Sequence, residues 1–378
     1  MMLNNRLRSF INDKHCTLLG IGVMSKNCVD ATIEIANNYN IPLMMIASRR
    51  QIESAQFGGG YVNNWTTETF AKYVKENDKN NNIILCRDHG GLWQNLFEKE
   101  QKLLLDEVMD TAKRSFKVDI ESGFDLIHID TSVDVHNKIN INESMRRMCE
   151  LYKYCGEIAK KYGKTVSYEI GSEEQSGTIQ NLDDLKYTIE NVQECCKINE
   201  LPLPIFVVVQ TGTKLMDRKN VGNFDENYKE IKNVINLCEK YDIMVKEHNT
   251  DYLSDPSLII HPKLGIHAAN VAPEFANQET IALIDILKKY NLNDLYEEFL
   301  KLSYESNNWR RWVSSNTKTT YIERVILSGH YIFSSYEFNI LKNKAKTELQ
   351  RYGINLDNEL KIHIKNSILR YLFNFNMI

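Results

Sequence analysis

Eight short apolar segments recur along the first 271 residues, and their spacing limits the possible folds more than any other feature. Each segment has seven or eight residues and is rich in β-branched side chains, as expected of strands that are covered on both faces. The segments are TLLGIGV (17–23), IPLMMIAS (41–48), NIILCRD (82–88), FDLIHID (124–130), TVSYEIG (165–171), IFVVVQT (205–211), YDIMVKEH (241–248) and LGIHAANV (264–271).

Amphipathic helical patterns separate these segments. NESMRRMCELYKYCGEIAKKYG (142–163) has apolar residues at helical spacing and ends on a glycine, and NLDDLKYTIENVQECCKI (181–198) begins with residues typical of a helix N-terminus. Strict alternation of strand and helix predicts a parallel sheet. Eight such units, with no G-x-G-x-x-G after the first strand, favour an α/β fold of the (β/α)8 TIM-barrel type over an open doubly wound sheet.

The pattern changes after residue 300. NNWRRWVSSNTKTTYIERVILSGHYIFSS and NELKIHIKNSILRYLFNFN are aromatic-rich and helical, without further strand–helix alternation. We therefore predict a barrel over residues 1–301 and a helical extension packed on it over residues 302–378. This extension could complete the mouth of the active site or form an interface in a homo-oligomer.

Composition excludes several classes of function. The 46 basic and 50 acidic residues give a net charge of −4, and the chain has neither a basic run nor an RNA-binding aromatic signature, so we expect no nucleic-acid partner. No apolar run reaches the roughly 18 residues of a membrane span, and the N-terminus lacks the apolar core of a signal peptide. We expect a cytoplasmic protein whose eight scattered cysteines are reduced.

Polar residues follow the carboxyl ends of all eight predicted strands, where the active sites of such barrels lie. Polar strand ends occur in any water-exposed barrel, but eight converging on one mouth favour a ligand or metal site. The residues are Ser25, Ser48 to Arg50, Asp88 and His89, Asp130 to Ser132, Glu169 with Ser172 to Glu174, Gln210 and Thr211, Glu247 to Asn249, and His267 to Asn270.

His89 and His248 stand out because they come from the third and seventh strands, on opposite sides of the barrel. Two imidazoles with a carboxylate and an open position are typical of a catalytic divalent-metal site, most often zinc. Such an ion could hold a substrate carbonyl and hydroxyl, with Asp88 as the base or acid. The alternative is that both histidines only bind loop backbone. His128, in the middle of its strand, is expected to be a core histidine.

Several motifs resemble the family of tagatose-bisphosphate aldolase non-catalytic (Z-type) subunits, which are barrels of the class II, metal-dependent aldolase type. The resemblance runs in one order along most of the chain. It is carried by QFGGGY (56–61), IILCRDHGGLWQ (83–94), FDLIHIDTS (124–132), SYEIGSEE (167–174), VVVQTGT (207–213) and EHNTDY (247–252), with looser counterparts in NNWRRW (307–312) and YIERVILSGHY (321–331).

The wider resemblance to class II aldolases implies roles for individual residues. Asp88 would be the acid or base, and His89 and His248 would be metal ligands. Glu169 would contact the metal, and Asp130 would support the site or bind an alternative metal. Glu173 is a further candidate for proton transfer. The candidates for binding substrate are Ser48, Arg49, Arg50, Asp130, Lys214, Asp251 and Asn270.

The chain also departs from the catalytic pattern. The sixth strand has Gln210 where catalytic class II aldolases have a metal histidine, and glutamine is the poorer Zn²⁺ ligand. The seventh strand lacks the glycine-rich phosphate loop, and IHAANVAPEF (266–275) does not reproduce the usual eighth-strand phosphate stretch.

Two functions remain open from the sequence. The first is a metal-dependent lyase or epimerase that acts on a phosphorylated or acidic sugar, with His89, Glu169, His248 and Gln210 around the metal. The second is a non-catalytic subunit that stabilises and activates a separate class II tagatose-bisphosphate aldolase subunit. Glu169 favours the enzyme, because the non-catalytic family is expected to have an apolar residue at that position in some members.

Overall fold

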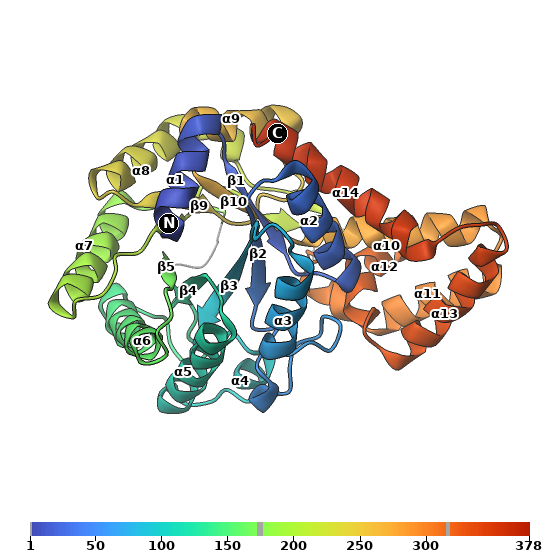
Figure 1. Ribbon diagram of the computed structural model, residues 1–378, viewed down its shortest axis with the longest axis horizontal. Helices are drawn as coiled ribbons and strands as arrows, with labels where there is room; N and C mark the ends of the chain where they lie inside the picture. The colour runs from blue at the N-terminus through green and yellow to red at the C-terminus, as the bar shows by residue number, and fades with distance from the viewer. Residues whose placement is uncertain (1, 172–176, 315–317) are drawn as a thin grey trace.

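A closed barrel of eight parallel strands forms the centre of the computed structural model, which describes residues 2–171, 177–314 and 318–378 (Figure 1). Around the barrel the strands are ordered β1-β10-β9-β6-β5-β4-β3-β2. The predicted TIM barrel is confirmed. The strands are β1 (Leu18–Gly22), β2 (Leu43–Ser48), β3 (Ile83–Gly91), β4 (Leu126–Asp130), β5 (Ser167–Gly171), β6 (Phe206–Val209), β9 (Met244–Glu247) and β10 (Ala268–Val271).

All eight predicted strands are present, but most are shorter than their apolar segments. Several flanking residues still bond to the next strand: the N–H of Asp125 donates to Leu85, that of Ile205 to Tyr168 and that of His267 to Val245. Helices cover the outside of the barrel, as Figure 1 shows. They are α1 (Leu3–Lys14), α2 (Lys26–Tyr39), α3 (Thr67–Asn77), α4 (Leu96–Glu100), α5 (Leu105–Ser122), α6 (Ile141–Lys161), α7 (Leu182–Ile198), α8 (Tyr228–Lys240), α9 (Asp255–Leu264) and α10 (Pro273–Lys289).

The ends of the two helices predicted in most detail follow from local chemistry. Asn140 caps α6 by accepting the N–H of Glu143, and Asn181 caps α7 by accepting the N–H groups of Asp183 and Asp184. These side chains satisfy donors that the first helical turn leaves unpaired. Gly163 follows α6 with a φ of +60°, a conformation that glycine adopts without strain.

A short two-stranded antiparallel hairpin, β7 (Leu215–Met216) with β8 (Lys219–Asn220), is inserted between β6 and α8. The backbone N–H of Asp217, at the tip of the hairpin, donates to the carbonyl of Trp312 at 3.0 Å. The insertion therefore joins the barrel mouth to the C-terminal extension.

Four α-helices follow the barrel: α11 (Asn293–Glu305), α12 (Tyr321–Ile332), α13 (Tyr336–Gln350) and α14 (Leu356–Asn374), with a 3-10 turn η3 (Asn308–Arg311) after α11. The predicted boundary at residues 301 and 302 falls inside α11. The first half of α14 shares a second apolar core with α10 to α13, whereas Ile364, Ile368 and Tyr371 belong to the core of the barrel. Figure 1 shows α14 running from this lobe back to the barrel. The extension is thus continuous with the barrel core.

None of the helices in the described ranges combines the length and the apolar character needed to cross a bilayer.

Asp125, at the entry to β4, leads to a prediction about pH. Its Oδ2 accepts the N–H of Leu85 at 2.9 Å, and burial raises the pKa of Asp125 to about 6. Because the unfolded value is near 3.9, the wild type loses stability as the pH rises from about 4 to about 6. Asparagine keeps the acceptor without the charge. We expect Asp125→Asn to raise the free energy of unfolding by about 1–2 kcal/mol at pH 7, and the gain to vanish near pH 4.

Urea unfolding at a series of pH values measures this difference. Asp285→Asn, at an exposed position of α10, is the matched control and should leave the profile unchanged. A gain from Asp125→Asn that is equally large at pH 4 and pH 7 would contradict the assignment.

Candidate active site

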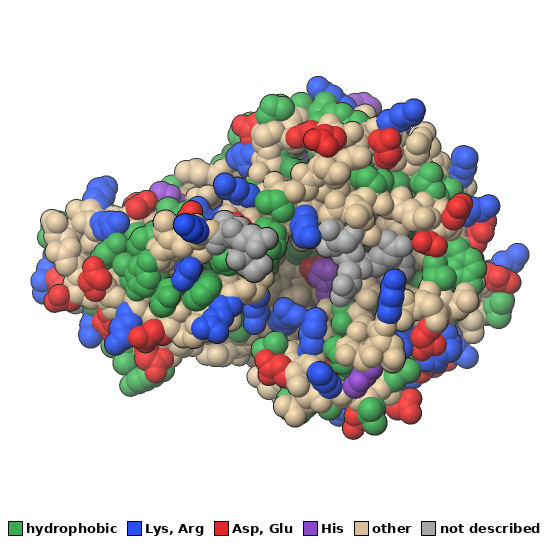
Figure 2. Space-filling view, turned by 180° about the vertical axis from the view of Figure 1, so that it is seen from behind, with side chains coloured by type: hydrophobic (Ala, Val, Ile, Leu, Met, Phe, Trp, Pro, Cys, Tyr) green, Lys and Arg blue, Asp and Glu red, His purple; other side chains and the backbone are tan. Residues whose placement is uncertain are grey.

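A cavity of about 450 Å³ opens at the carboxyl ends of the strands. Figure 2 shows it as a hollow with a histidine in its depth and Lys and Arg side chains around it. Its walls come from the strand ends, the following loops and the C-terminal extension. They are formed by Met24, Ile46, Ser48, Arg50, Gln51, Tyr61, Asp88, His89, Gln94, Ser132, Val133, Leu215, His248, Asn249, Asp251, Asn270, Ala272, Pro273, Arg311, Trp312 and Tyr331.

A bulge in β3 brings Asp88 and His89 to the same site. Between Arg87 and Gly90 the strand advances three residues while β4 advances two, and His89 has a φ of +45°. Neighbouring side chains on a regular strand point to opposite faces, whereas a bulge re-aims one of them. The next residue must be small, because a Cβ on Gly90 would lie 2.7 Å from the carbonyl oxygen of His128.

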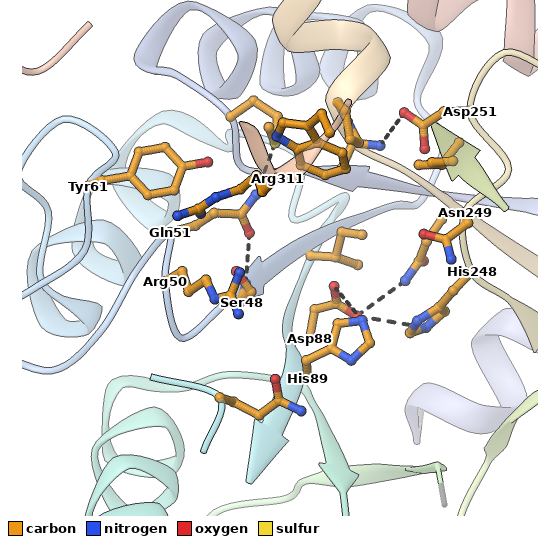
Figure 3. Close-up of a pocket in the computed structure, with 18 of the residues that line it drawn as sticks. Ser48, Arg50, Gln51, Tyr61, Asp88, His89, His248, Asn249, Asp251 and Arg311 are labelled. Carbon is orange, nitrogen blue, oxygen red and sulfur yellow. Dashed lines mark hydrogen bonds and ion pairs between the residues drawn. The ribbon is translucent and has the colours of Figure 1, made fainter. Parts of the chain in front are cut away.

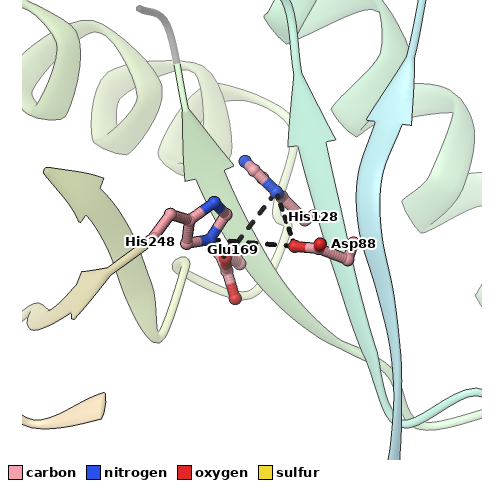
Figure 4. Close-up of side chains that lie close together, drawn as sticks. All are labelled: Asp88, His128, Glu169 and His248. Atoms are coloured by element: carbon pink, nitrogen blue, oxygen red, sulfur yellow. Dashed lines mark hydrogen bonds and ion pairs between the residues drawn. The ribbon is translucent and has the colours of Figure 1, made fainter. Parts of the chain in front are cut away.

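Four side chains converge below the cavity: Asp88, His128, Glu169 and His248 (Figure 4). Nε2 of His248 lies 3.4 Å from Oε1 of Glu169 and 3.7 Å from Oδ1 of Asp88. Nδ1 of His128 lies 3.7 Å and 3.9 Å from the same two oxygens. Two imidazoles and two carboxylates from four different strands therefore surround one point.

The geometry fits a divalent ion. An ion held at about 2.1 Å by four tetrahedral ligands keeps those ligands about 3.4 Å apart, close to the separations found here. Nδ1 of His128 also accepts the backbone N–H of His89 at 3.2 Å, so an ion would replace this hydrogen bond. The Nε2 atom of His128 is buried without a partner among the described residues, which leaves the ring free of a competing bond on that side.

Lys246 balances part of the negative charge. Its ammonium lies 2.6 Å from Oε2 of Glu169, and both side chains are 1% exposed. Although burial opposes ionisation, Lys246 and the nearby imidazoles lower the pKa of Glu169 to about 2. Burial lowers the pKa of Lys246, but the Glu169 carboxylate outweighs this and raises it. The lysine therefore stays charged and is a poor nucleophile. Oε1 of Glu169 remains directed at the cluster.

His89 lies above the cluster, on the cavity wall. Its Nδ1 is 2.7 Å from Oδ2 of Asp130, and its Nε2 is 3.9 Å from Oδ2 of Asp88. Although partial burial of the ring opposes its ionisation, the Asp88 and Asp130 carboxylates raise the pKa of His89 to about 9. His89 and Asp130 form a second group of potential ligands with His128. The structure thus puts Asp88 in the four-residue cluster and His89 beside it, whereas the sequence predicts His89 as the ligand and Asp88 as the proton carrier.

The prediction that Arg49 binds substrate is wrong. Its side chain is 1% exposed, donates to Glu53 at 2.6 Å and to Glu98 at 2.7 Å, and also donates to the carbonyl of Gly91. The Arg49 charge is neutralised inside the barrel wall by Glu53 and Glu98, because a buried guanidinium needs carboxylate partners. Arg50, the next residue, lines the cavity.

The other predicted residues are dispersed. Oε1 of Gln210 accepts from Thr178, and its backbone N–H donates to Gln180, so the amide is engaged outside the four-residue cluster. Lys214 is exposed and does not belong to the cavity wall formed by the described residues. Glu173 lies outside the described residues.

Asp251, Ser48 and Asn270 line the cavity. Oδ1 of Asp251 accepts the N–H groups of Ala272 and Glu274 at the start of α10, and burial raises the pKa of Asp251 to about 8. Asn270 donates to Asp88 at 3.3 Å, and Ser48 pairs in register with Asp88.

Sequence reasoning misses His128 and Lys246. The signal for both is the two-residue repeat of a strand, since His128 precedes Asp130 by two residues and Lys246 precedes His248 by two. Each therefore faces the barrel interior with its partner. His128 is also opposite Glu169 in the β4–β5 register.

Comparisons with known proteins agree with this architecture. The family described as D-tagatose-1,6-bisphosphate aldolase subunit GatZ/KbaZ-like matches residues 5–326. A comparison with curated proteins gave no match.

Solved structures with the same fold include a probable tagatose 6 phosphate kinase from Sinorhizobium meliloti 1021, with 17% identity, 94% of this chain and 99% of the other covered, and a TM-score of 0.75. A fructose-bisphosphate aldolase from Campylobacter jejuni has 12% identity, 100% and 96% coverage and a TM-score of 0.58. A fructuronate-tagaturonate epimerase from Cohnella laeviribosi has 10% identity, 96% and 81% coverage and a TM-score of 0.56. At these identities the likeness shows the fold.

Proposed function

The chain belongs to the D-tagatose-1,6-bisphosphate aldolase subunit GatZ/KbaZ-like family, a class II aldolase-like family of carbohydrate metabolism, and we propose that it is itself a metal-dependent enzyme. The reaction is aldol cleavage, or epimerisation by related chemistry, of a phosphorylated or acidic sugar. The observation that carries this proposal is the four-residue cluster below the cavity. We further propose that the enzyme acts in the cytoplasm, where its eight free cysteines would stay reduced.

His248, Glu169, Asp88 and His128 would hold the ion, which is zinc in our proposal because a set of two imidazoles and two carboxylates suits it. When bound, such an ion polarises a substrate carbonyl and stabilises the negative charge that develops on its oxygen. Lys246 keeps Glu169 ionised and oriented, and so supports the ligand set without touching the substrate.

His89 is the residue best placed to move a proton. Its side chain is 37% exposed to the cavity, and Asp130 fixes the ring through Nδ1. This leaves Nε2 toward the space where a substrate hydroxyl would lie. Ser48 and Asn270 would bind further hydroxyl groups from the neighbouring strand ends.

The test is an activity assay on ketose phosphates and sugar acids, run before and after removal of metal with a chelator. Activity that disappears with the metal and returns with zinc supports the proposal. His89→Gln is expected to lower kcat by about a hundredfold or more while the protein keeps its metal, because only the proton transfer is impaired. Loss of the metal in this variant would show that His89 is a ligand instead.

The second candidate is a non-catalytic subunit, and two observations favour it. Lys246 occupies Oε2 of Glu169, and the sixth strand supplies Gln210 rather than a histidine. In that case the purified chain would lack metal and activity but would bind a separate class II aldolase subunit and raise its activity. Size-exclusion chromatography of the chain alone, and with such a subunit, distinguishes this complex from a homo-oligomer.

A further inference from the structure

Two arginines from distant parts of the chain meet on one side of the cavity. Arg50 follows β2, and Arg311 is the last residue of η3 in the C-terminal extension. Both line the cavity, and Figure 3 shows them on the side opposite Asp88, His89 and His248. Arg50 is half-buried, whereas Arg311 is exposed at the rim.

The positive charges of this pair have no counterpart in the protein that the structure describes. The ion pairs among residues 2–171, 177–314 and 318–378 include neither arginine. Burial and the Arg311 guanidinium lower the pKa of Arg50, and burial and Arg311 lower the pKa of the neighbouring His330 to about 3. Arg49 shows the contrast, since two carboxylates pair with its guanidinium.

An aromatic cluster contacts one of the two arginines, Arg311. The Arg311 guanidinium lies 5.4 Å from the centre of the Tyr331 ring, and that ring lies 5.0 Å from the ring of Tyr61. The indole N–H of Trp312 donates to the hydroxyl of Tyr331 at 3.0 Å. A guanidinium has five N–H donors in its own plane, so Arg311 keeps donors beyond the one engaged with the hydroxyl of Tyr331. Arg311 is therefore held against aromatic rings, and no ion pair within the described ranges neutralises either arginine.

We propose that Arg50 and Arg311 form an anion subsite that binds the phosphate group of the substrate, so that the C-terminal extension completes the active site. That the bound phosphate belongs to a substrate rests on the proposed function, whereas the binding of phosphate itself does not. Two guanidiniums offer paired N–H donors and two positive charges, which match a phosphate monoester dianion. A sugar carboxylate offers one negative charge and two oxygens. The phosphorylated class is therefore favoured over the acidic one.

Titration of the full-length protein with inorganic phosphate, followed by ³¹P NMR, tests the subsite. Arg311→Gln is expected to weaken phosphate binding about tenfold or more, because each lost charge-assisted hydrogen bond is worth at least that factor. Arg50→Gln should have a similar effect. Arg310→Gln removes the same charge one residue away, from a side chain that lies against Trp309, and should leave binding unchanged.

Two outcomes would overturn the proposal. One is wild-type affinity for phosphate in Arg311→Gln, which is exposed and should fold normally. The other is displacement of phosphate by acetate at equal concentration, because the site would then be a carboxylate site. His248→Ala separates this proposal from the proposed function, since it should lose metal and keep phosphate binding. A wild type that binds phosphate but no metal would support the subsite and contradict the metal-dependent enzyme.

Discussion

Replacement of His248 by alanine is expected to abolish the binding of one divalent ion per chain and to reduce activity by about a thousandfold or more. Nε2 of His248 approaches the carboxylates of Asp88 and Glu169 at 3.7 and 3.4 Å, so its removal opens one side of the ligand set. Loss of residues that only orient ligands costs about tenfold to a hundredfold in metal affinity, and the loss of a ligand should cost more. The expected loss of activity follows because the bound ion would stabilise the charge of the transition state by several kcal/mol.

Metal content by plasma mass spectrometry and titration with zinc measure the first effect, and the aldolase or epimerase assay measures the second. His363→Ala is the control, because His363 is an exposed histidine of α14, remote from the cavity wall. The circular dichroism spectra of His248→Ala and His363→Ala should match that of the wild type, so that the losses cannot be due to unfolding. Full metal occupancy in purified His248→Ala would remove the observation on which the proposed function rests.

The largest expected effect on stability comes from Asp119→Ala. Arg87 and Asp119 are fully buried and form two hydrogen bonds, at 2.6 and 2.8 Å, between β3 and α5. The same guanidinium donates to the carbonyls of Ala47 and Ile52, and so holds the end of β2 as well. Removal of the carboxylate leaves a buried, uncompensated charge, and we expect the free energy of unfolding to fall by about 3–5 kcal/mol.

Denaturant unfolding monitored by circular dichroism measures this loss. Asp110→Ala is a matched control on the same helix, where Asp110 pairs with Arg114 at 2.9 Å in solvent. It should cost less than about 1 kcal/mol, because water screens an exposed pair. Equal effects of the two substitutions would show that burial of the Arg87–Asp119 pair does not determine its contribution.

The fold was predictable because its signal is local. A strand covered on both faces must be apolar along a short run, and a helix on the outside must be apolar at every third or fourth position. Both patterns lie within windows of about 20 residues, so the order of the eight strands follows from the sequence. The predicted strand ends are less accurate, because the apolar segments run on into loop residues that stay buried, such as Thr17 and Ile243.

The candidate site was predictable in part. The sequence predicts Asp88 and His248 from their positions at strand ends and Glu169 from the resemblance to class II aldolases, and the structure brings the three together. His128 is interpreted from the sequence as a core residue, because it lies in the middle of its strand, two residues before Asp130. The different positions of Asp88 and His89 depend on a bulge, which is created by pairing with β4 and cannot be read from β3 alone.

Local sequence patterns establish the number and order of the barrel units, the polar residues at their carboxyl ends and the helical character of the extension. Three-dimensional packing is needed to see that Arg49 is neutralised by Glu53 and Glu98, while Arg50 faces the cavity with Arg311. The periodicity of an element decides which of its faces is buried. The groups met there come from distant segments, since Arg50 and Arg311 are 261 residues apart, and packing and charge balance in three dimensions select them.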